Sequence, residues 1–294
     1  MTAGAAELQS SLKQLQECRG NPALLCHSPL AGDLVPVLYQ GLRSIGRTER
    51  LDLVLSTYGG SVTAARQLAL LLREFTGRLT ILVPHRARSA GTLLCLSADE
   101  LVLTAVAELG PLDANSDAAE FPGPGMPGSI SAEDIRAFPD LARDWFGVES
   151  DGLQLLALLS QRIFPASLAS FYRMDRLIRQ TAGELLEFPF PDPADEQLRA
   201  RIVEQLVTGY HAHDYVLTRA DVRRLGLPVS EPGPDADGLL WTIARQLDRL
   251  GAQPAGSDGS IAGLVAGVGF LACNVIRRPA GDAEPGVPEW QVDG

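Results

Sequence analysis

Lysine is nearly absent from this chain, which contains one residue of that type, Lys13. The sequence has 25 basic and 36 acidic residues, giving a formal net charge of −11, and nearly all of the positive charge is arginine. A surface that binds nucleic acid normally gathers Lys and Arg in a basic patch, and no run of basic residues occurs here. The composition therefore argues against nucleic acid as a partner.

Motifs for metal binding and secretion are missing as well. The four cysteines lack CxxC or CxxH spacing, which argues against a disulfide framework or a zinc site and favours reduced, buried thiols. His211 and His213 alternate without a third ligand nearby, so we expect no metal, and no motif implies a cofactor. No basic stretch followed by an apolar run marks a signal peptide, and we expect a cytoplasmic protein.

A membrane-spanning run is not evident either. Residues 260–276 are apolar but are short for a bilayer span and contain Gly263, Gly267 and Gly269. We interpret this segment as a buried strand or helix, and we do not expect membrane association.

Strand and helix patterns alternate along the first hundred residues. Apolar runs predict strands at 23–27, 51–57, 79–84 and 101–104, and helical periodicity predicts helices at 7–19, 34–45, 62–75 and 90–97. This alternation predicts an α/β fold in which parallel strands are covered by helices on both faces.

The remaining segments predict the domain organisation. We expect one domain over residues 1–278, with a helical extension at about 131–210 that begins at a capping Ser131. Residues 115–130 are rich in Pro and Gly and predict a surface loop. Residues 279–294, rich in Pro, Gly and acidic residues, predict a disordered tail.

Two glycine-containing turns suggest a site for acyl transfer. Gly59 and Gly60 end one predicted strand, and Ser89-Ala90-Gly91 follows the next. A serine becomes a nucleophile when a base accepts its proton and backbone N–H groups stabilise the oxyanion. Ser89 is the candidate nucleophile, and the amides of Gly60 and Ala90 are the candidate oxyanion donors.

Three blocks around these turns resemble the serine dehydrogenase proteinase family. They are V-P-H-R-A-R-S-A-G-T-L-L with the following A-D-E-L-V-L, L-G-P-L-D, and residues 208–228, so that the resemblance spans about residues 20–230. This family belongs to the Clp-protease-like, crotonase-fold group that includes signal peptide peptidase A. The resemblance implies stacked parallel strands with flanking helices and a serine peptidase with Ser89 as nucleophile and Gly60 and Ala90 as oxyanion donors. It also implies association into trimeric or larger rings.

The general base is left open by the sequence. Signal peptide peptidases of this fold use a lysine, and Lys13 lies far outside the motif blocks. Asp113 falls where the Clp proteolytic subunit has its histidine, but an aspartate is a weak base unless burial raises its pKa. His85 and His213 are the other candidates, and we rank His213 slightly higher because a neighbouring Asp can orient it.

The sequence thus favours a serine endopeptidase that acts on peptides or proteins. Two alternatives stay open at this point. The first is an inactive Clp-fold scaffold or peptide-binding protein, which the missing lysine supports. The second is a crotonase-like acyl-CoA enzyme, because the same pair of backbone donors can hold a thioester enolate.

Overall fold

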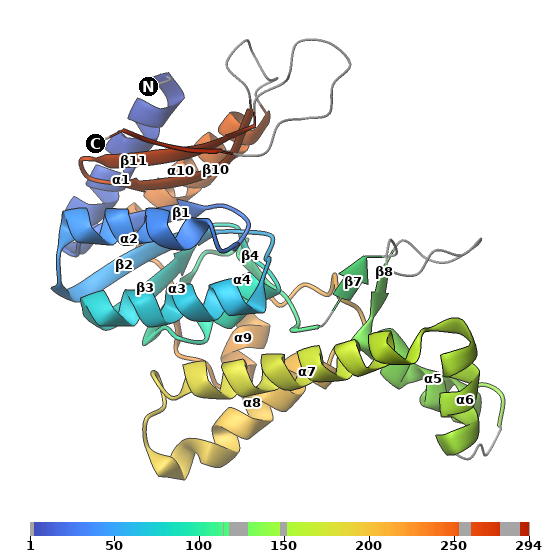
Figure 1. Cartoon of the computed structure of the whole chain (residues 1–294). Helices are drawn as coiled ribbons and strands as arrows, with labels where there is room; N and C mark the ends of the chain where they lie inside the picture. The colour runs from blue at the N-terminus through green and yellow to red at the C-terminus, as the bar shows by residue number, and fades with distance from the viewer. Residues whose placement is uncertain are drawn as a thin grey trace, which may run out of the picture.

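The computed structural model describes residues 3–113, 115–117, 129–147, 152–252, 260–276 and 289–293. An eight-stranded sheet forms its centre, in the order β12-β11-β10-β1-β2-β3-β5-β9 (Figure 1). The parallel strands are β1 (Ala23–His27), β2 (Thr48–Ser56), β3 (Thr76–Val83), β5 (Glu100–Leu103) and β9 (Val229–Ser230). The α/β class and the parallel core predicted from the sequence are therefore confirmed.

Both faces of the sheet are covered, because successive strand residues point to opposite sides. On one side, Leu24 of β1 packs in a core with α2 (Leu34–Ile45) and α3 (Val62–Phe75). On the other side, Leu25 packs with α1 (Ala3–Arg19) and α10 (Pro234–Ala252). Figure 1 shows these helix pairs on opposite faces. This burial on two sides explains why the strands read as continuous apolar runs.

The apolar segment near the C-terminus forms two strands. β10 (Ser260–Gly267) and β11 (Phe270–Ile276) make an antiparallel hairpin that turns at Val268 and Gly269, and β10 pairs with β1. Of the buried strand or helix expected from the sequence, the structure has strands. Among the helices in the described ranges, none has the length and apolar character needed to cross a bilayer.

The structure differs from the sequence prediction at the far edge of the sheet. Glu289–Asp293 forms β12, which pairs antiparallel with β11, whereas a disordered tail was predicted there. The physical reason is Trp290, whose ring packs against the main core and whose Nε1–H donates to Asp33 Oδ2 at 2.9 Å. The rest of the predicted tail lies outside the described residues.

The predicted helical extension consists of several helices below the sheet in Figure 1. They are α5 (Ala132–Asp144), α6 (Gly152–Arg162), α7 (Pro165–Leu186) and α8 (Glu196–Thr208), followed by the shorter α9 (Arg219–Leu225). Ser131 caps α5 in a capping box with Asp134, as expected from the sequence. Of the predicted loop at 115–130, Asn115–Asp117 and Ser129–Ser131 form the β7–β8 hairpin, and residues 118–128 lie outside the described ranges.

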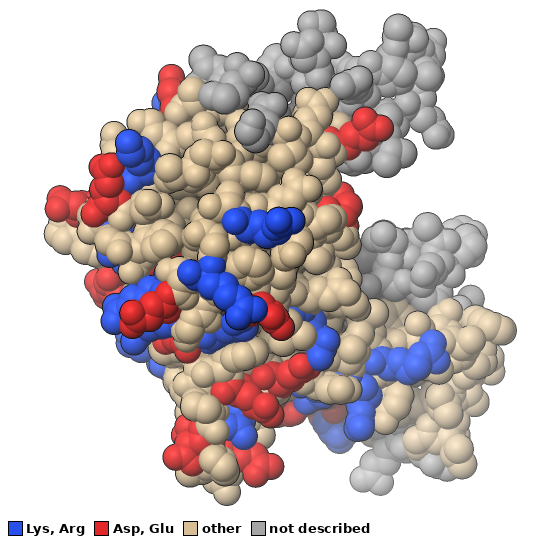
Figure 2. Space-filling model, turned by 60° about the vertical axis from the view of Figure 1, so that its left-hand side comes forward, with Lys and Arg blue, Asp and Glu red and all other residues tan. Residues whose placement is uncertain are grey.

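One ion pair joins the helical extension to a helix that covers the sheet. The Arg66 guanidinium of α3 holds Glu184 of α7 through two hydrogen bonds, at 2.7 and 2.6 Å. Nearby, Arg73 Nη1 lies 2.6 Å from Asp99 Oδ2. Figure 2 shows the same intermingling of arginine and acidic side chains over one face of the molecule. The Arg66–Glu184 pair helps to seat the second half of α7 beside the carboxyl ends of the parallel strands.

Candidate active site

Ser89 occupies a strained turn between a short strand and a helix. β4 (Arg86–Ala87) precedes it and α4 (Ala90–Cys95) follows, with every residue of α4 buried. Ser89 has φ 51° and ψ −117°, and it is the one non-glycine residue with positive φ in the described part of the chain. Such a conformation costs roughly 1–3 kcal/mol and is found mainly at functional sites. The Ser89 side chain forms no capping bond to α4, which leaves the hydroxyl available.

The glycine pair lies directly against this turn. Gly59 and Gly60 have φ values of 119° and 143°, and a Cβ on Gly60 would lie 2.3 Å from the carbonyl oxygen of Leu30. A Cβ on Gly59 would lie 3.0 Å from Ser89 Cβ. Within the described residues, neither the Gly60 N–H nor the Ala90 N–H donates a hydrogen bond. Two free amides therefore flank the serine, as the oxyanion prediction requires.

Asp113 reaches the same cavity at the end of a braced segment. Leu109 of β6 (Glu108–Leu109) exchanges two backbone hydrogen bonds with Leu217, each 3.0 Å. Further along, Leu112 N–H donates to Leu206 O of α8 at 2.9 Å. These bonds hold the segment that ends in Asp113 between the serine turn and α8.

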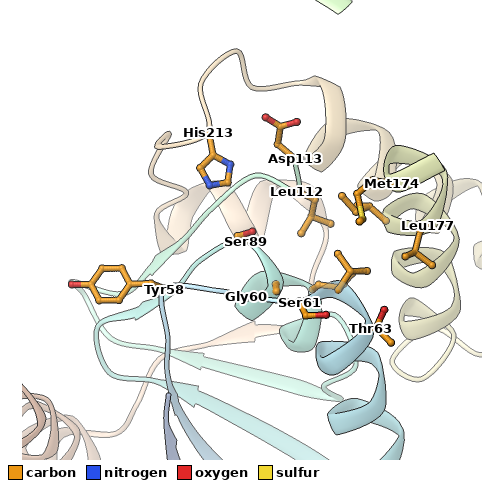
Figure 3. Close-up of a pocket in the computed structure, with 14 residues that line it drawn as sticks. Tyr58, Gly60, Ser61, Thr63, Ser89, Leu112, Asp113, Met174, Leu177 and His213 are labelled. Atoms are coloured by element: carbon orange, nitrogen blue, oxygen red, sulfur yellow. The ribbon is translucent and has the colours of Figure 1, made fainter. Parts of the chain in front are cut away.

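His213 comes from the loop that precedes Leu217. In Figure 3 the His213 imidazole and the Asp113 carboxyl lie beside each other on one side of Ser89. All three residues line one cavity of about 470 Å³. Among the described residues, the Ser89 hydroxyl forms no hydrogen bond with either partner, and such bonds are often long before substrate binds.

The electrostatic surroundings of Asp113 separate it from surface aspartates. Burial raises the pKa of the Asp113 carboxyl above its usual value, while Ser131, His213 and Arg136 act in the opposite direction. Its Oδ1 atom is buried and has no hydrogen-bond partner in the described residues. A buried carboxylate oxygen without a partner, next to an imidazole, is suited to accept an N–H from that ring.

The opposite wall of the cavity is apolar, and the sequence analysis did not identify it. Leu93 and Leu112 line it together with Met174, Leu177 and Ile178 of α7. Figure 3 shows Met174 and Leu177 on the far side of the cavity from His213, with Leu112 between them. The α7 residues are distant in sequence from Ser89, and no local motif marks them, since their role arises only from the packing of α7 on α3 and α4.

Tyr58 marks the outer rim of the cavity. Its ring is 70% exposed, and it points away from the Asp113–His213 pair in Figure 3. The Arg86 guanidinium lies 4.6 Å from the ring centroid.

The other histidines lie away from the cavity. His85 does not line it, because its ring is held by the Arg86 guanidinium, 2.8 Å from Nδ1, beside Glu108 at 4.0 Å. The structure therefore does not bring His85 to Ser89. His211 Nδ1 faces Glu133 at 3.4 Å, and His27 Nδ1 lies 3.0 Å from Ser56 Oγ. No group of three or more His, Cys, Asp or Glu side chains in the described ranges is arranged to hold a metal ion.

Two curated relatives are similar to this chain over much of its length. The uncharacterized proteins MJ1495 and MJ0137 of Methanocaldococcus jannaschii are 27% and 25% identical over 205 and 209 residues. These matches cover 70% and 71% of this chain but only 60% and 63% of the relatives.

Solved protease structures are also similar. The 1510-N membrane-bound stomatin-specific protease, solved as a mutant, aligns over 79% of this chain and 84% of its own, at 13% identity and a TM-score of 0.44. ClpP1 from Listeria monocytogenes aligns over 77% of this chain and 98% of its own, at 13% identity and a TM-score of 0.38.

A family model provides the more specific match. Residues 36–134 match the model of the ClpP-like SDH-type serine proteinases. This stretch includes both glycines of the first turn, Ser89, Ala90 and Asp113, and it ends before α7 and His213. The family resemblance inferred from the sequence is thus confirmed, and the segment that carries Gly60, Ser89 and Asp113 matches the model of the ClpP-like SDH-type serine proteinases.

Proposed function

We propose that this protein is a serine endopeptidase that hydrolyses peptide or protein substrates through an acyl-enzyme on Ser89. The observation that carries the proposal is the strained Ser89 turn, packed against two amides without partners and facing an Asp–His pair across one cavity. A turn of this kind exposes a serine hydroxyl, and the two amides match the donors needed for a tetrahedral oxyanion.

In the proposed reaction, Ser89 Oγ attacks the scissile carbonyl carbon and its proton passes to the His213 imidazole. The carbonyl oxygen takes up the negative charge and is bound by the N–H groups of Gly60 and Ala90. The C–N bond then breaks, and the imidazolium returns the proton to the leaving amine. Water, deprotonated by the same imidazole, hydrolyses the ester and restores the serine.

We assign Asp113 the orienting role because its Oδ1 is buried, lacks a partner and lies next to His213. Ionised Asp113 would stabilise the imidazolium that forms when His213 accepts the proton. Lys13 cannot be the base, because it lies on α1, on the face of the sheet covered with α10, and its Nζ pairs with Glu17 at 4.0 Å.

The apolar wall suggests how a peptide would lie. An extended substrate beside Gly60 would direct one side chain toward Leu93, Leu112 and Met174. We therefore propose a preference for apolar side chains at this position. In line with the sequence-based expectations, we also propose that protomers associate into rings, which light scattering tests. We further propose that the protein acts in the cytoplasm, which cell fractionation tests.

A fluorophosphonate probe tests the nucleophile directly. The reaction forms an Oγ–P bond on an activated serine and releases fluoride, so mass spectrometry can locate the adduct. We expect labelling of Ser89 that is lost in Ser89→Ala. The matched control is Ser61→Ala, since Ser61 lines the same cavity and caps α3 through the Ala64 N–H. Labelling that survives Ser89→Ala would remove Ser89 as the nucleophile.

The inactive-scaffold alternative has one observation in its favour. Ser89 is not hydrogen-bonded to His213, whose side chain is exposed. If the wild-type protein is not labelled in any oligomeric state, while peptides still bind at the cavity, this alternative replaces the peptidase.

A further inference from the structure

Thr92 links the two halves of the candidate site through one buried hydroxyl. It lies in α4, three residues after Ser89, and its side chain is fully buried. The hydroxyl donates to the Ala87 carbonyl oxygen at 2.9 Å and accepts from the Gly110 N–H at 3.0 Å. A threonine hydroxyl has one donor, and here both the donor and one acceptor position are used on backbone groups.

The two backbone groups belong to the segments that present the reacting side chains. Ala87 ends β4, and the chain then enters the Ser89 turn. Gly110 follows β6 in the segment that ends in Asp113. These segments touch, since a Cβ on Gly110 would lie 3.5 Å from both Arg88 Cβ and Ser89 N.

The segment on the Gly110 side is also connected to His213. Its neighbour Leu109 exchanges two backbone hydrogen bonds with Leu217, which ends the loop that carries His213. A displacement of the segment would therefore move Asp113 and the base of that loop together, while Ser89 stays on α4. The Thr92 hydroxyl is placed to fix this relative position.

We propose that Thr92 is a positioning residue that sets the geometry between the Ser89 turn and the Asp113–His213 pair. The inference rests on the proposed peptidase function, because it assigns Thr92 a role in activating Ser89. Thr92 is not among the residues that line the cavity. Its effect is transmitted through the Ala87 carbonyl and the Gly110 amide.

Thr104 provides a matched control for burial and for loss of a hydroxyl. It is also buried, and its Oγ1 donates to the Pro84 carbonyl oxygen at 2.9 Å. Thr104 follows β5 and lies outside the cavity around Ser89. Thr92→Val and Thr104→Val each replace a buried hydroxyl with a methyl group of similar size. Thr92→Ser keeps the hydroxyl and serves as the conservative variant.

The first measurement is the rate of Ser89 labelling by the fluorophosphonate across pH 5–9, at a temperature where every variant is folded by circular dichroism. We expect Thr92→Val to slow labelling roughly tenfold and to flatten its pH dependence, because the base no longer assists the serine. Thr92→Ser and Thr104→Val should stay within about twofold of the wild type and keep its pH profile. Equal effects of Thr92→Val and Thr104→Val, or an unchanged profile in Thr92→Val, would overturn the proposal.

The second measurement does not require catalysis. The NMR chemical shifts of the His213 ring protons at a fixed pH report the position of the imidazole relative to Asp113 and Ser89. We expect these shifts to change in Thr92→Val and to be unchanged in Thr104→Val. If wild-type Ser89 is not labelled, the proposed function fails, and the NMR comparison alone decides for or against the positioning role. Identical His213 ring-proton shifts in wild type and Thr92→Val count against it.

Discussion

Gly59 lies in van der Waals contact with the turn that carries Ser89, so that a Cβ on Gly59 would meet Ser89 Cβ at 3.0 Å and Ala90 N at 3.4 Å. The two turns are thus one packed unit, and the free amides of Gly60 and Ala90 are held at a fixed separation. This close approach requires a residue without a side chain at Gly59, and it is accompanied by backbone strain at Ser89. Changes at either turn are therefore expected to affect both stability and the reactivity of Ser89.

Gly60→Ala is expected to destabilise the protein strongly and to abolish labelling of Ser89. The new methyl group would lie 2.3 Å from a backbone oxygen, and φ is 143°, so we expect a loss of roughly 2–4 kcal/mol. Gly20→Ala is the control, since Gly20 has φ 70° but no atom within 4 Å of the added group. There the loss should be roughly 1 kcal/mol with labelling unchanged. Urea unfolding measures the stability of both variants. Equal losses of stability in Gly60→Ala and Gly20→Ala would contradict the steric argument.

Asp113→Asn should have opposite effects on reactivity and stability at neutral pH. Burial raises the pKa of Asp113, so the folded protein binds this proton more tightly than the unfolded chain. The stability linked to that proton is fully present below the unfolded pKa of about 4 and is lost as the pH rises through the folded pKa.

An asparagine stays neutral, so Asp113→Asn should be more stable than the wild type at pH 7 but not at pH 3. Labelling of Ser89 should fall by roughly a hundredfold or more, because the imidazole loses its orienting carboxylate. Denaturation at the two pH values, paired with labelling at pH 7, tests this. A variant that is less stable at pH 7 and equally reactive would refute both parts.

His27 should make the protein sensitive to mild acid. Burial lowers the pKa of its imidazole, so the unfolded chain binds the proton more tightly than the folded one. The stability linked to neutral His27 is present above the unfolded pKa of about 6.5 and is lost as the pH falls through the folded pKa. In His27→Gln the urea midpoint should therefore fall less between pH 7.5 and pH 5 than in the wild type. Parallel slopes in the two proteins would show that another group is responsible.

Met174 is expected to influence which peptides are cleaved. It lines the cavity from α7 opposite the polar residues, so Met174→Asp places a charge where we propose an apolar side chain binds. KM for peptides with Leu or Phe at that position should rise roughly tenfold, while Met174→Leu leaves it nearly unchanged. Labelling by a small fluorophosphonate, which does not occupy the apolar wall, should be the same in all three proteins. A uniform loss of labelling would point to disruption of the site instead.

Local patterns were sufficient to predict four parallel strands of the central sheet, β1, β2, β3 and β5, and the two turns. The aliphatic runs of β1, β2 and β3 are continuous because both faces of the sheet are covered. The glycine pair indicated a turn because positions 59 and 60 both have a positive φ, which favours glycine. The backbone strain at Ser89 could not be predicted from the sequence. A positive φ usually indicates Gly, Asn or Asp, and serine at this position gives no such signal.

Features that arise from distant contacts could not be predicted in the same way. The sequence left three candidate bases open and ranked His213 only slightly higher. Packing separates His85, held by Arg86, from Asp113 and His213 in the cavity. The α7 wall depends on a helix that docks through Arg66 and Glu184, far apart in the chain. The β12 strand was missed because one tryptophan in a polar, proline-rich tail gives almost no periodic signal.

The residues that line the cavity run in the sequence from Tyr58 to His213, and this has a consequence for biosynthesis. A ribosome completes the Ser89 turn long before it has made α7 or the loop that presents His213. During that interval the nascent chain carries Ser89 without the imidazole that we propose as its base and without the apolar wall. Under the proposed mechanism, Ser89 therefore gains its base and its apolar wall only after the chain has been made as far as His213.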